Sequence, residues 1–230
     1  MPLPLRAVLF DLDGTLIDSI GLIVDAMHYA FEGFDGTTPA DADWMLGIGT
    51  PLSKQLALYA RNDTELEWLR DRYRTYQGIH HDNVVREFPG TTSVLSELQA
   101  RGLMMALVTS KVDALAQRGL DLTKLSRFIP VVIGADSVVR HKPDPEPVLT
   151  ALGRLGVATD EAVFVGDSPH DIASGNAAGV KTIGALWGPF TREQVAVAQP
   201  THFIGDIRDL PALLDLMRAD RQETVSRPQQ

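Results

Sequence analysis

Two aspartates directly after a short apolar segment are the residues of this sequence best suited to chemistry. Asp11 and Asp13 follow the apolar segment 7–10 in the run Phe-Asp-Leu-Asp-Gly-Thr. In extended backbone, side chains two residues apart point to the same side, so both carboxylates can face one point. Gly14 allows a sharp turn beyond them. Carboxylates this close repel each other unless a cation or substrate lies between them, so we expect a reactive site rather than only a turn and helix cap before Ser19.

Short apolar runs indicate the elements that would position these aspartates. Four runs span 7–10, 103–108, 131–133 and 162–165, and a fifth candidate spans 182–186. The four do not alternate with polar residues, which is typical of parallel strands covered on both faces. Helical patterns lie between the runs, for example at 93–101 and 148–155. This order predicts an α/β fold with a doubly wound parallel sheet.

The interval between the first two runs departs from this order. From Ser19 to about His81, apolar residues recur at helical spacing with little strand signal, which predicts a helical subdomain inserted after the first strand. We therefore expect an α/β core at 1–15 and 84–218 and a helical cap at 16–83. The polar segment 219–230 is predicted to be a flexible tail.

Composition limits the classes of partner. The 230 residues include 44% hydrophobic residues, no cysteine, and a formal net charge of −9. A field of that sign disfavours nucleic acid and anionic membranes, and an anionic substrate would need local positive charge. Without cysteine, thiolate chemistry and disulfides are excluded. With no signal-like start and no apolar run long enough to span a bilayer, we expect a cytoplasmic protein.

Polar residues also follow each of the later predicted strands. Thr109 and Ser110 end the run at 103–108, Lys142 lies in a proline-flanked loop after the third run, and Asp167 and Asp171 follow the fourth. Ligands of open α/β sheets bind outside the carboxyl ends of the strands. Ser110 could instead cap a helix, and Asp171 could occupy the favoured first turn of one, so both of these alternatives stay open.

With these motifs in this order from Phe10 to Ile172, the chain resembles the haloacid dehalogenase superfamily of phosphatases, which have a Rossmann-like core. The resemblance implies that Asp11 attacks phosphorus to form an aspartyl-phosphate and that Asp13 acts as general acid and base. It further implies that Thr109 and Lys142 hold the phosphoryl oxygens, and the Lys142 ammonium is expected to offset the charge of the clustered aspartates as well.

The same resemblance implies a magnesium cofactor. Asp11, the backbone carbonyl of Asp13, and Asp167 would hold Mg²⁺, which prefers hard oxygen ligands. Asp171 is an auxiliary metal residue or only a helix cap, and the sequence does not decide between them.

The substrate is expected to be a small phosphorylated metabolite. Asp13 is the residue of the phosphatase and phosphomutase members, whereas dehalogenase relatives carry Tyr there. In the predicted cap, Gly47, Gly49 and Thr50 could offer backbone N–H groups to a second anionic group, although a helix end at Gly47 and a helix cap at Thr50 explain them equally well. Ser110 is a further expected substrate contact.

The cap segment resembles the branch of phosphoglycolate phosphatases and pyrophosphatase-like proteins, so phosphoglycolate is the first expected substrate. Inorganic pyrophosphatase, sugar-phosphate phosphatase and phosphomutase activities are alternatives. A receiver-like domain and a non-catalytic binding protein are alternatives of another class. The receiver would lack the helical insertion, and the binding protein could lose Asp13 or Lys142, both of which are present. The sequence does not predict the oligomeric state.

Overall fold

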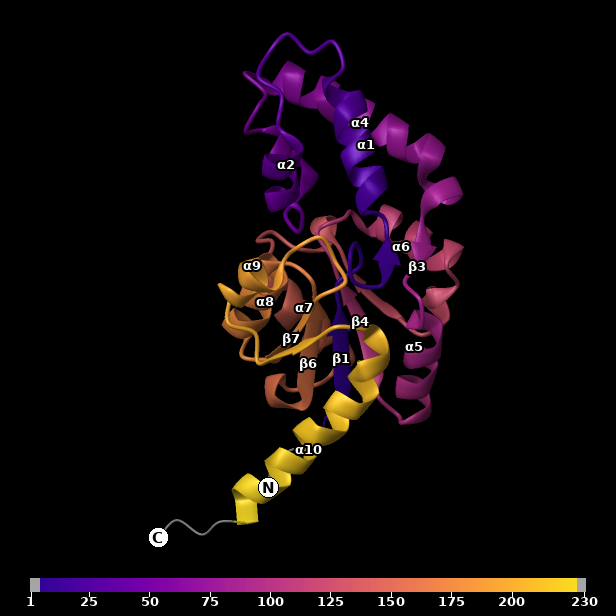
Figure 1. Cartoon of the computed structure of the whole chain (residues 1–230), viewed down its shortest axis with the longest axis vertical. Coiled ribbons are helices and arrows are strands. Elements are labelled where there is room, and N and C mark those ends of the chain that lie inside the picture. The colour runs from indigo at the N-terminus through magenta and orange to yellow at the C-terminus, as the bar shows by residue number, and fades with distance from the viewer. Residues whose placement is uncertain (1–4, 227–230) are drawn as a thin grey trace.

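A six-stranded parallel sheet forms the centre of the computed structural model, which describes residues 5–226 and side chains up to residue 218 (Figure 1). The strand order is β5-β4-β1-β6-β7-β8. The strands are β1 (Ala7–Phe10), β4 (Met104–Val108), β5 (Val131–Ile133), β6 (Ala162–Gly166), β7 (Lys181–Ala185) and β8 (His202–Ile204). The predicted fold class is confirmed.

The central strand shows why the apolar runs do not alternate with polar residues. Ala7 and Leu9 of β1 belong to one hydrophobic cluster, and Val8 and Phe10 belong to another on the opposite face of the sheet. Helices α5 (Thr91–Ala100), α6 (Asp113–Leu122) and α10 (Leu210–Ser226) supply the cluster around Phe10. Helices α7 (Glu146–Leu155) and α8 (Pro169–Ala178) supply the other. Since both faces are covered, every side chain of the strand is apolar.

Two features at the end of the chain differ from the sequence expectation. The strand β8 was not predicted, because its three residues begin with His202 and leave only two consecutive apolar side chains. Residues 219–226, expected to begin a flexible tail, continue α10, and 227–230 lie outside the described residues. The short helix α9 (Arg192–Ala196) lies between β7 and β8.

Within the described residues, no helix combines the length and the apolar character needed to cross a membrane.

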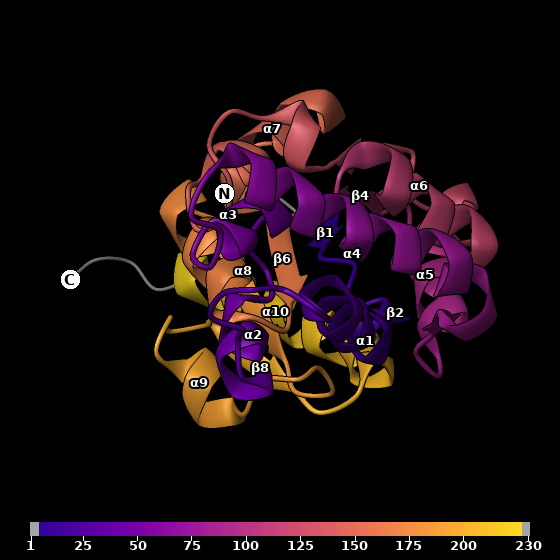
Figure 2. The same cartoon turned by 90° about the horizontal axis from the view of Figure 1, so that it is seen from above.

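The helical insertion is connected to the sheet by two very short strands. β2 (Ile17–Asp18) leads out of the core and pairs antiparallel with β3 (Arg86–Glu87), through which the chain returns. Between them lie α1 (Ile20–Phe31), α2 (Asp41–Gly47), α3 (Leu52–Leu56) and α4 (Asp63–Val84), which we call the cap. The cap stands over the carboxyl end of β1, as the views along and across the molecule show (Figures 1 and 2). The domain limits given above remain a prediction.

The helix pair α1 and α4 holds the cap together. The side chain of Asn62 caps the start of α4 by accepting a hydrogen bond from the backbone N–H of Glu65 at 3.0 Å. Farther along, Arg72 stacks on the rings of Tyr29 and Trp68 and donates to the backbone carbonyl of Tyr29 at 2.6 Å. Arg72 therefore satisfies a carbonyl at the C-terminal end of α1, where helical acceptors lack partners.

Replacement of Arg72 by methionine should destabilise the protein while keeping much of the apolar contact. We expect Arg72→Met to lower the free energy of unfolding by about 1–3 kcal/mol, because a charged donor to buried carbonyls is lost. Urea denaturation measures this change. The control Lys54→Met removes an exposed cation of the cap and should shift the value by less than about 0.5 kcal/mol. Equal effects of the two substitutions would contradict this role of Arg72.

Candidate active site

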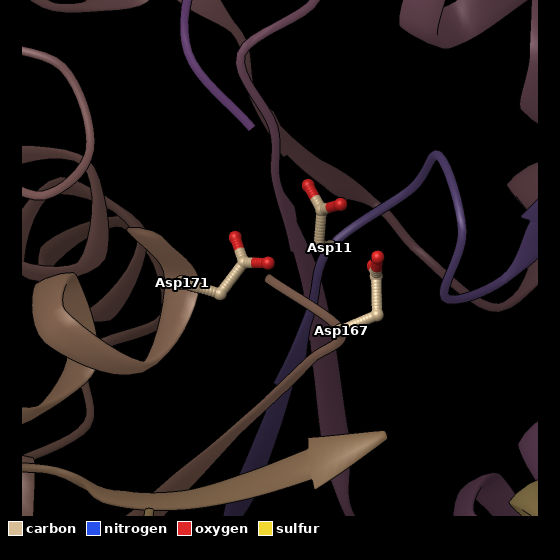
Figure 3. A group of neighbouring side chains, drawn as sticks. All are labelled: Asp11, Asp167 and Asp171. Carbon is tan, nitrogen blue, oxygen red and sulfur yellow. The ribbon is translucent and has the colours of Figure 1, made fainter. Parts of the chain in front are cut away.

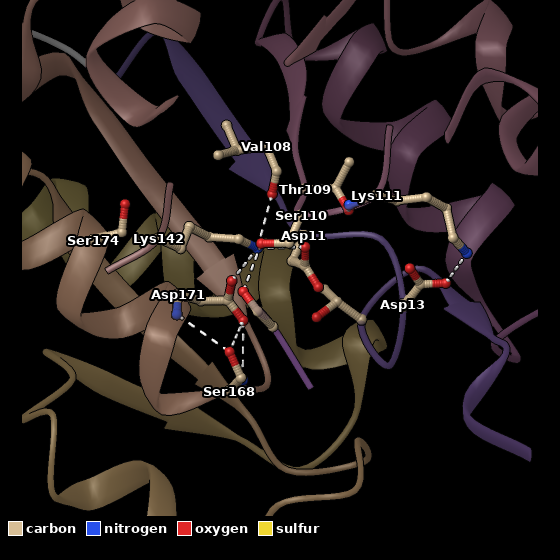
Figure 4. A network of polar contacts seen from close by, with 12 residues as sticks. Asp11, Asp13, Val108, Thr109, Ser110, Lys111, Lys142, Ser168, Asp171 and Ser174 are labelled. Carbon is tan, nitrogen blue, oxygen red and sulfur yellow. Dashed lines mark hydrogen bonds and ion pairs between the residues drawn. The ribbon is translucent and has the colours of Figure 1, made fainter. Parts of the chain in front are cut away.

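The register of the sheet places the predicted site residues side by side at the carboxyl ends of the strands. Phe10 at the end of β1 lies opposite Leu107 of β4 and Val165 of β6. Asp11, which follows Phe10, therefore emerges between the ends of the two neighbouring strands, close to Thr109 and Asp167. The sequence placed these residues at strand ends, and the parallel pairing makes them neighbours, as Figure 3 shows for Asp11 and Asp167 and Figure 4 for Asp11 and Thr109.

Three carboxylates form a buried group at this edge. One side-chain oxygen from each of Asp11, Asp167 and Asp171 lies within 4.8 Å of the others (Figure 3). The Oδ2 atom of Asp167 is buried and has no hydrogen-bond partner among the described residues. An unpartnered carboxylate oxygen in such a position is costly unless a cation binds it. The donor set, made of hard oxygen atoms, fits a magnesium ion.

Lys142 lies between two of these acids. Its Nζ donates to Asp11 Oδ1 at 2.7 Å, to Asp171 Oδ1 at 2.5 Å and to the backbone carbonyl of Val108 at 3.2 Å (Figure 4). Burial opposes its charge, but the carboxylates of Asp11 and Asp171 outweigh burial and raise the pKa of Lys142. The Lys142 ammonium is bound to carboxylates, and Lys142 is not among the residues that line the cavity described below, so its direct contact with phosphate stays a prediction.

Burial and the neighbouring charges also raise the pKa values of two of the acids. Burial, partly offset by Lys142 and reinforced by Asp171, raises the pKa of Asp11 to about 7. Burial, followed by the charges of Asp171 and Asp11, raises the pKa of Asp167 well above its usual range. One buried ammonium thus does not fully compensate the burial of Asp11 and Asp167, and additional positive charge would favour the ionised forms of these two acids.

Asp167 is held in place by residues of the turn after β1. Thr15 Oγ1 donates to Asp167 Oδ1 at 2.6 Å, a contact that sequence reasoning missed although Thr15 belongs to the first motif. Gly14 has a φ of +87°, and a Cβ there would lie 2.6 Å from Asp167 Oδ2. The glycine is needed both for the left-handed turn and for the close approach of the acid.

Asp171 caps a helix, as one of the two alternatives for its position requires, while its role as a metal residue stays a prediction. Its Oδ2 accepts from the backbone N–H of Ser168 at 3.0 Å and from Ser168 Oγ at 2.7 Å, completing a capping box at the start of α8. Its Oδ1 meanwhile binds Lys142 within the carboxylate group. One side chain therefore caps a helix and contributes to the candidate metal site.

Asp13 lies apart from this group and has different partners. Its Oδ1 accepts from Ser19 Oγ at 2.5 Å and from Lys111 Nζ at 2.6 Å. Sequence reasoning assigned no role to Lys111, which could have been noticed as the cation directly after Thr109 and Ser110. Lys142 thus binds Asp11, whereas Lys111 binds Asp13 (Figure 4).

A cavity of about 130 Å³ lies between the edge of the sheet and the cap. Asp11, Asp13, Thr109, Asp167 and Ser110 line it from the core. The Thr109 backbone N–H is bound to the carbonyl of Ile133, and its hydroxyl oxygen accepts from the N–H of Lys111 at 3.2 Å.

The predicted cap residues are divided between cavity and scaffold. Gly49 and Thr50 line the cavity, whereas Gly47 does not, and the Gly47 carbonyl accepts from Thr50 Oγ1 at 2.7 Å. Ser110 Oγ donates to the backbone carbonyl of Gly49 at 2.6 Å. The hydroxyl expected to bind substrate therefore joins the core to the cap. Sequence reasoning missed the cavity residues of α4, which are Arg70, Tyr73, Arg74 and Gln77.

Known proteins resemble this chain in sequence and in fold. The sequence profile of a family described as haloacid dehalogenase-like hydrolase matches residues 8–185. Pyrophosphatase PpaX of Bacillus pumilus (strain SAFR-032) is 35% identical over 211 residues, covering 91% of this chain and 96% of that protein. Pyrophosphatase PpaX of Halalkalibacterium halodurans is 34% identical, covering 93% and 97%. A crystal structure named as a predicted phosphoglycolate phosphatase from Haemophilus somnus 129PT has a TM-score of 0.81 at 25% identity, covering 90% and 97%.

Removal of the buried ammonium should be strongly destabilising. We expect Lys142→Met to lower the free energy of unfolding by about 3–5 kcal/mol at pH 8, because Asp11 and Asp171 would be left buried without a counter-charge. Urea denaturation of the metal-free protein measures the change. Lys111→Met serves as the control, since Lys111 pairs with one carboxylate at the cavity wall and its loss should cost less. A loss from Lys142→Met no greater than that of the control would contradict this account.

Proposed function

The chain belongs to the haloacid dehalogenase-like hydrolase family, and on that premise we propose that it hydrolyses small phosphorylated metabolites with Asp11 as the nucleophile. The observation that carries the proposal is the position of Asp11. Its carboxylate lines the cavity at the end of the central strand while Lys142 binds one of its two oxygens. A carboxylate held in one orientation at the base of a cavity is suited to in-line attack on phosphorus.

The first step forms an aspartyl-phosphate. We assign the attack to Asp11 Oδ2, because Oδ1 is bound by Lys142. As the new bond from Oδ2 to phosphorus forms, the bond from phosphorus to the leaving oxygen breaks, and Asp13 donates a proton to that oxygen. The second step reverses the role of Asp13. It takes a proton from a water molecule, whose oxygen attacks phosphorus, and the bond to Asp11 breaks to release phosphate.

Other groups of the core support this chemistry. Thr109 lines the cavity next to Asp11, so its hydroxyl group is placed to donate to a phosphoryl oxygen. Lys111 and Ser19 hold Asp13 at the cavity wall, which limits the positions that its carboxyl group can take. Such prior orientation reduces the entropy lost on reaching the transition state.

Magnesium is the proposed cofactor. Asp11, Asp167 and Asp171 would hold the ion, with the backbone carbonyl of Asp13 as a further ligand expected from the family. When bound, the ion supplies positive charge that lets an anionic carboxylate approach an anionic phosphate. The unpartnered Oδ2 of Asp167 supports this assignment.

The names of similar proteins suggest which substrates to test first. Relatives are named pyrophosphatases, and a similar structure is named as a predicted phosphoglycolate phosphatase. Phosphoglycolate is our first proposed substrate, with pyrophosphate and sugar phosphates as alternatives. The cavity is smaller than the ~300–1,000 Å³ typical of sites for drug-sized ligands, which supports a small metabolite. The net charge of −9 and the absence of cysteine support a cytoplasmic enzyme that does not bind nucleic acid.

Replacement of the nucleophile should abolish turnover. We expect Asp11→Asn to reduce phosphate release from p-nitrophenyl phosphate, phosphoglycolate and pyrophosphate to below about one thousandth of the wild-type rate, because an amide does not form the acyl phosphate. The control is Asp18→Asn, the same change at an exposed position in β2, which should retain activity. Circular dichroism checks that both variants are folded. Substantial turnover by folded Asp11→Asn would refute the assignment of the nucleophile.

Metal removal provides a separate test. We expect chelation to silence phosphatase activity and added Mg²⁺ to restore it. Because an ion that binds only the folded state stabilises it, saturating Mg²⁺ should also raise the Tm by a few degrees. Asp167→Asn should lose most of that shift, whereas Asp144→Asn, an acid outside the carboxylate group, should keep it. An unchanged Tm shift in Asp167→Asn would remove this residue from the metal site.

A further inference from the structure

Given the proposed phosphatase function, on which this step rests, we infer that Arg70 and Arg74 of the cap form a binding site for a second anionic group on the substrate. The substrate class is then a phosphoryl group joined to a part that carries its own carboxylate or phosphate. The site lies opposite Asp11, on the wall of the cavity that faces the leaving group.

One face of α4 forms this wall. Arg70, Tyr73, Arg74 and Gln77 all line the cavity, and their spacing of three and four residues places them along a single side of the helix. Tyr73 and Gln77 are buried, and Gln77 Nε2 donates to the Tyr73 hydroxyl at 3.2 Å. The two arginines thus stand beside a fixed polar pair. Like charges four residues apart on a helix repel each other, and a shared anion would relieve that repulsion.

Neither arginine is well satisfied by the protein itself. The carboxylates nearest to the Arg70 guanidinium are those of Glu67 and Asp71, both at 3.8 Å, and its Nε atom is buried without an acceptor. Arg74 makes no hydrogen bond or ion pair with any residue of the segment 5–218. Arg72, on the same helix, is by contrast bound to backbone carbonyls and stacked on two rings. On this helix, the two arginines that face the cavity are therefore bound by the protein much less closely than Arg72 is.

The acidic residues that line the cavity, Asp11, Asp13 and Asp167, all belong to the core. The core cation that lines it, Lys111, is paired with Asp13, whereas Arg70 and Arg74 line it from the cap. A phosphoryl group attacked by Asp11 must lie against the core, so the remainder of the substrate extends toward the cap. In a chain with a net charge of −9, Arg70 with only two long ion pairs at 3.8 Å and Arg74 with none in the segment 5–218 favour an anionic leaving group.

Guanidinium chemistry defines the ligand more closely. The planar fork of donors on an arginine matches the two oxygens of a carboxylate or of a phosphate, and such charge-assisted pairs are stronger than neutral hydrogen bonds. Phosphoglycolate would present a carboxylate and pyrophosphate a phosphate. Neutral sugar phosphates would present only hydroxyl groups and leave both cations without a counter-charge.

A matched pair of substrates tests the site. Phosphoglycolate and 2-hydroxyethyl phosphate have similar size, but only the first has a carboxylate on its leaving group. Pyrophosphate tests a leaving group that carries a phosphate instead. We expect kcat/KM of the wild type to be at least about tenfold higher for phosphoglycolate or pyrophosphate than for 2-hydroxyethyl phosphate. Arg70→Gln and Arg74→Gln should each lower that ratio about tenfold to a hundredfold. The charged substrate whose kcat/KM ratio falls more in the arginine variants carries the preferred anion.

The control is Lys54→Gln, which removes an exposed cap cation outside the cavity and should leave the ratio unchanged. The inference is overturned if the wild type shows no preference, or if the arginine variants lower kcat/KM for charged and neutral substrates equally.

A binding measurement separates this inference from the proposed function. Calorimetric titration of the Asp11→Asn protein with phosphoglycolate and with 2-hydroxyethyl phosphate requires no turnover. Tighter binding of phosphoglycolate, lost on adding Arg74→Gln, supports the anion site even if the wild type hydrolyses no phosphoester. Equal binding of the two compounds overturns the site while leaving a general phosphatase activity intact.

Discussion

The buried ammonium of Lys142 between Asp11 and Asp171 is the interaction on which the rest of this structure depends. A parallel sheet with both faces covered provides the desolvated edge at which the carboxylates meet, and desolvation is the first cause of the raised pKa values of Asp11 and Asp167. Lys142 offsets part of that penalty and holds Asp11 by one oxygen. The remaining deficit of positive charge makes the site suited to a divalent ion.

The supporting residues are fitted closely around this cluster. Gly14 leaves room for Asp167, Thr15 binds one of its oxygens, and Ser168 binds the oxygen of Asp171 that Lys142 does not. Each carboxylate therefore has a partner that sets its orientation as well as its charge. Rigid placement of this kind is needed where reacting groups have to meet in line, because small displacements reduce the rate strongly.

The core and the cap contribute different groups to the cavity. The core presents the acids, Thr109 and Lys111 at strand ends, whereas the cap contributes a helix face with Arg70 and Arg74. Ser110 joins the two parts through the carbonyl of Gly49. Lys142, the core cation expected to meet phosphate and the clustered aspartates, holds Asp11. Arg70 and Arg74, to which sequence reasoning assigned no role, line the cavity from the cap.

The sequence by itself determined the fold class and the members of the core site. Uninterrupted apolar runs identify strands buried on both faces, and Asp11, Thr109 and Asp167 follow such runs directly, so their meeting at one sheet edge is a consequence of parallel pairing. It did not reveal β8, whose segment begins with His202 and has only two consecutive apolar residues. Only the tertiary structure decided which two carboxylates Lys142 binds, that Ser110 contacts the cap, and that Arg70 and Arg74 face the cavity while Arg72 does not. These contacts depend on how α4 packs across the strand ends, and helical periodicity specifies which residues share a face but not what that face will meet.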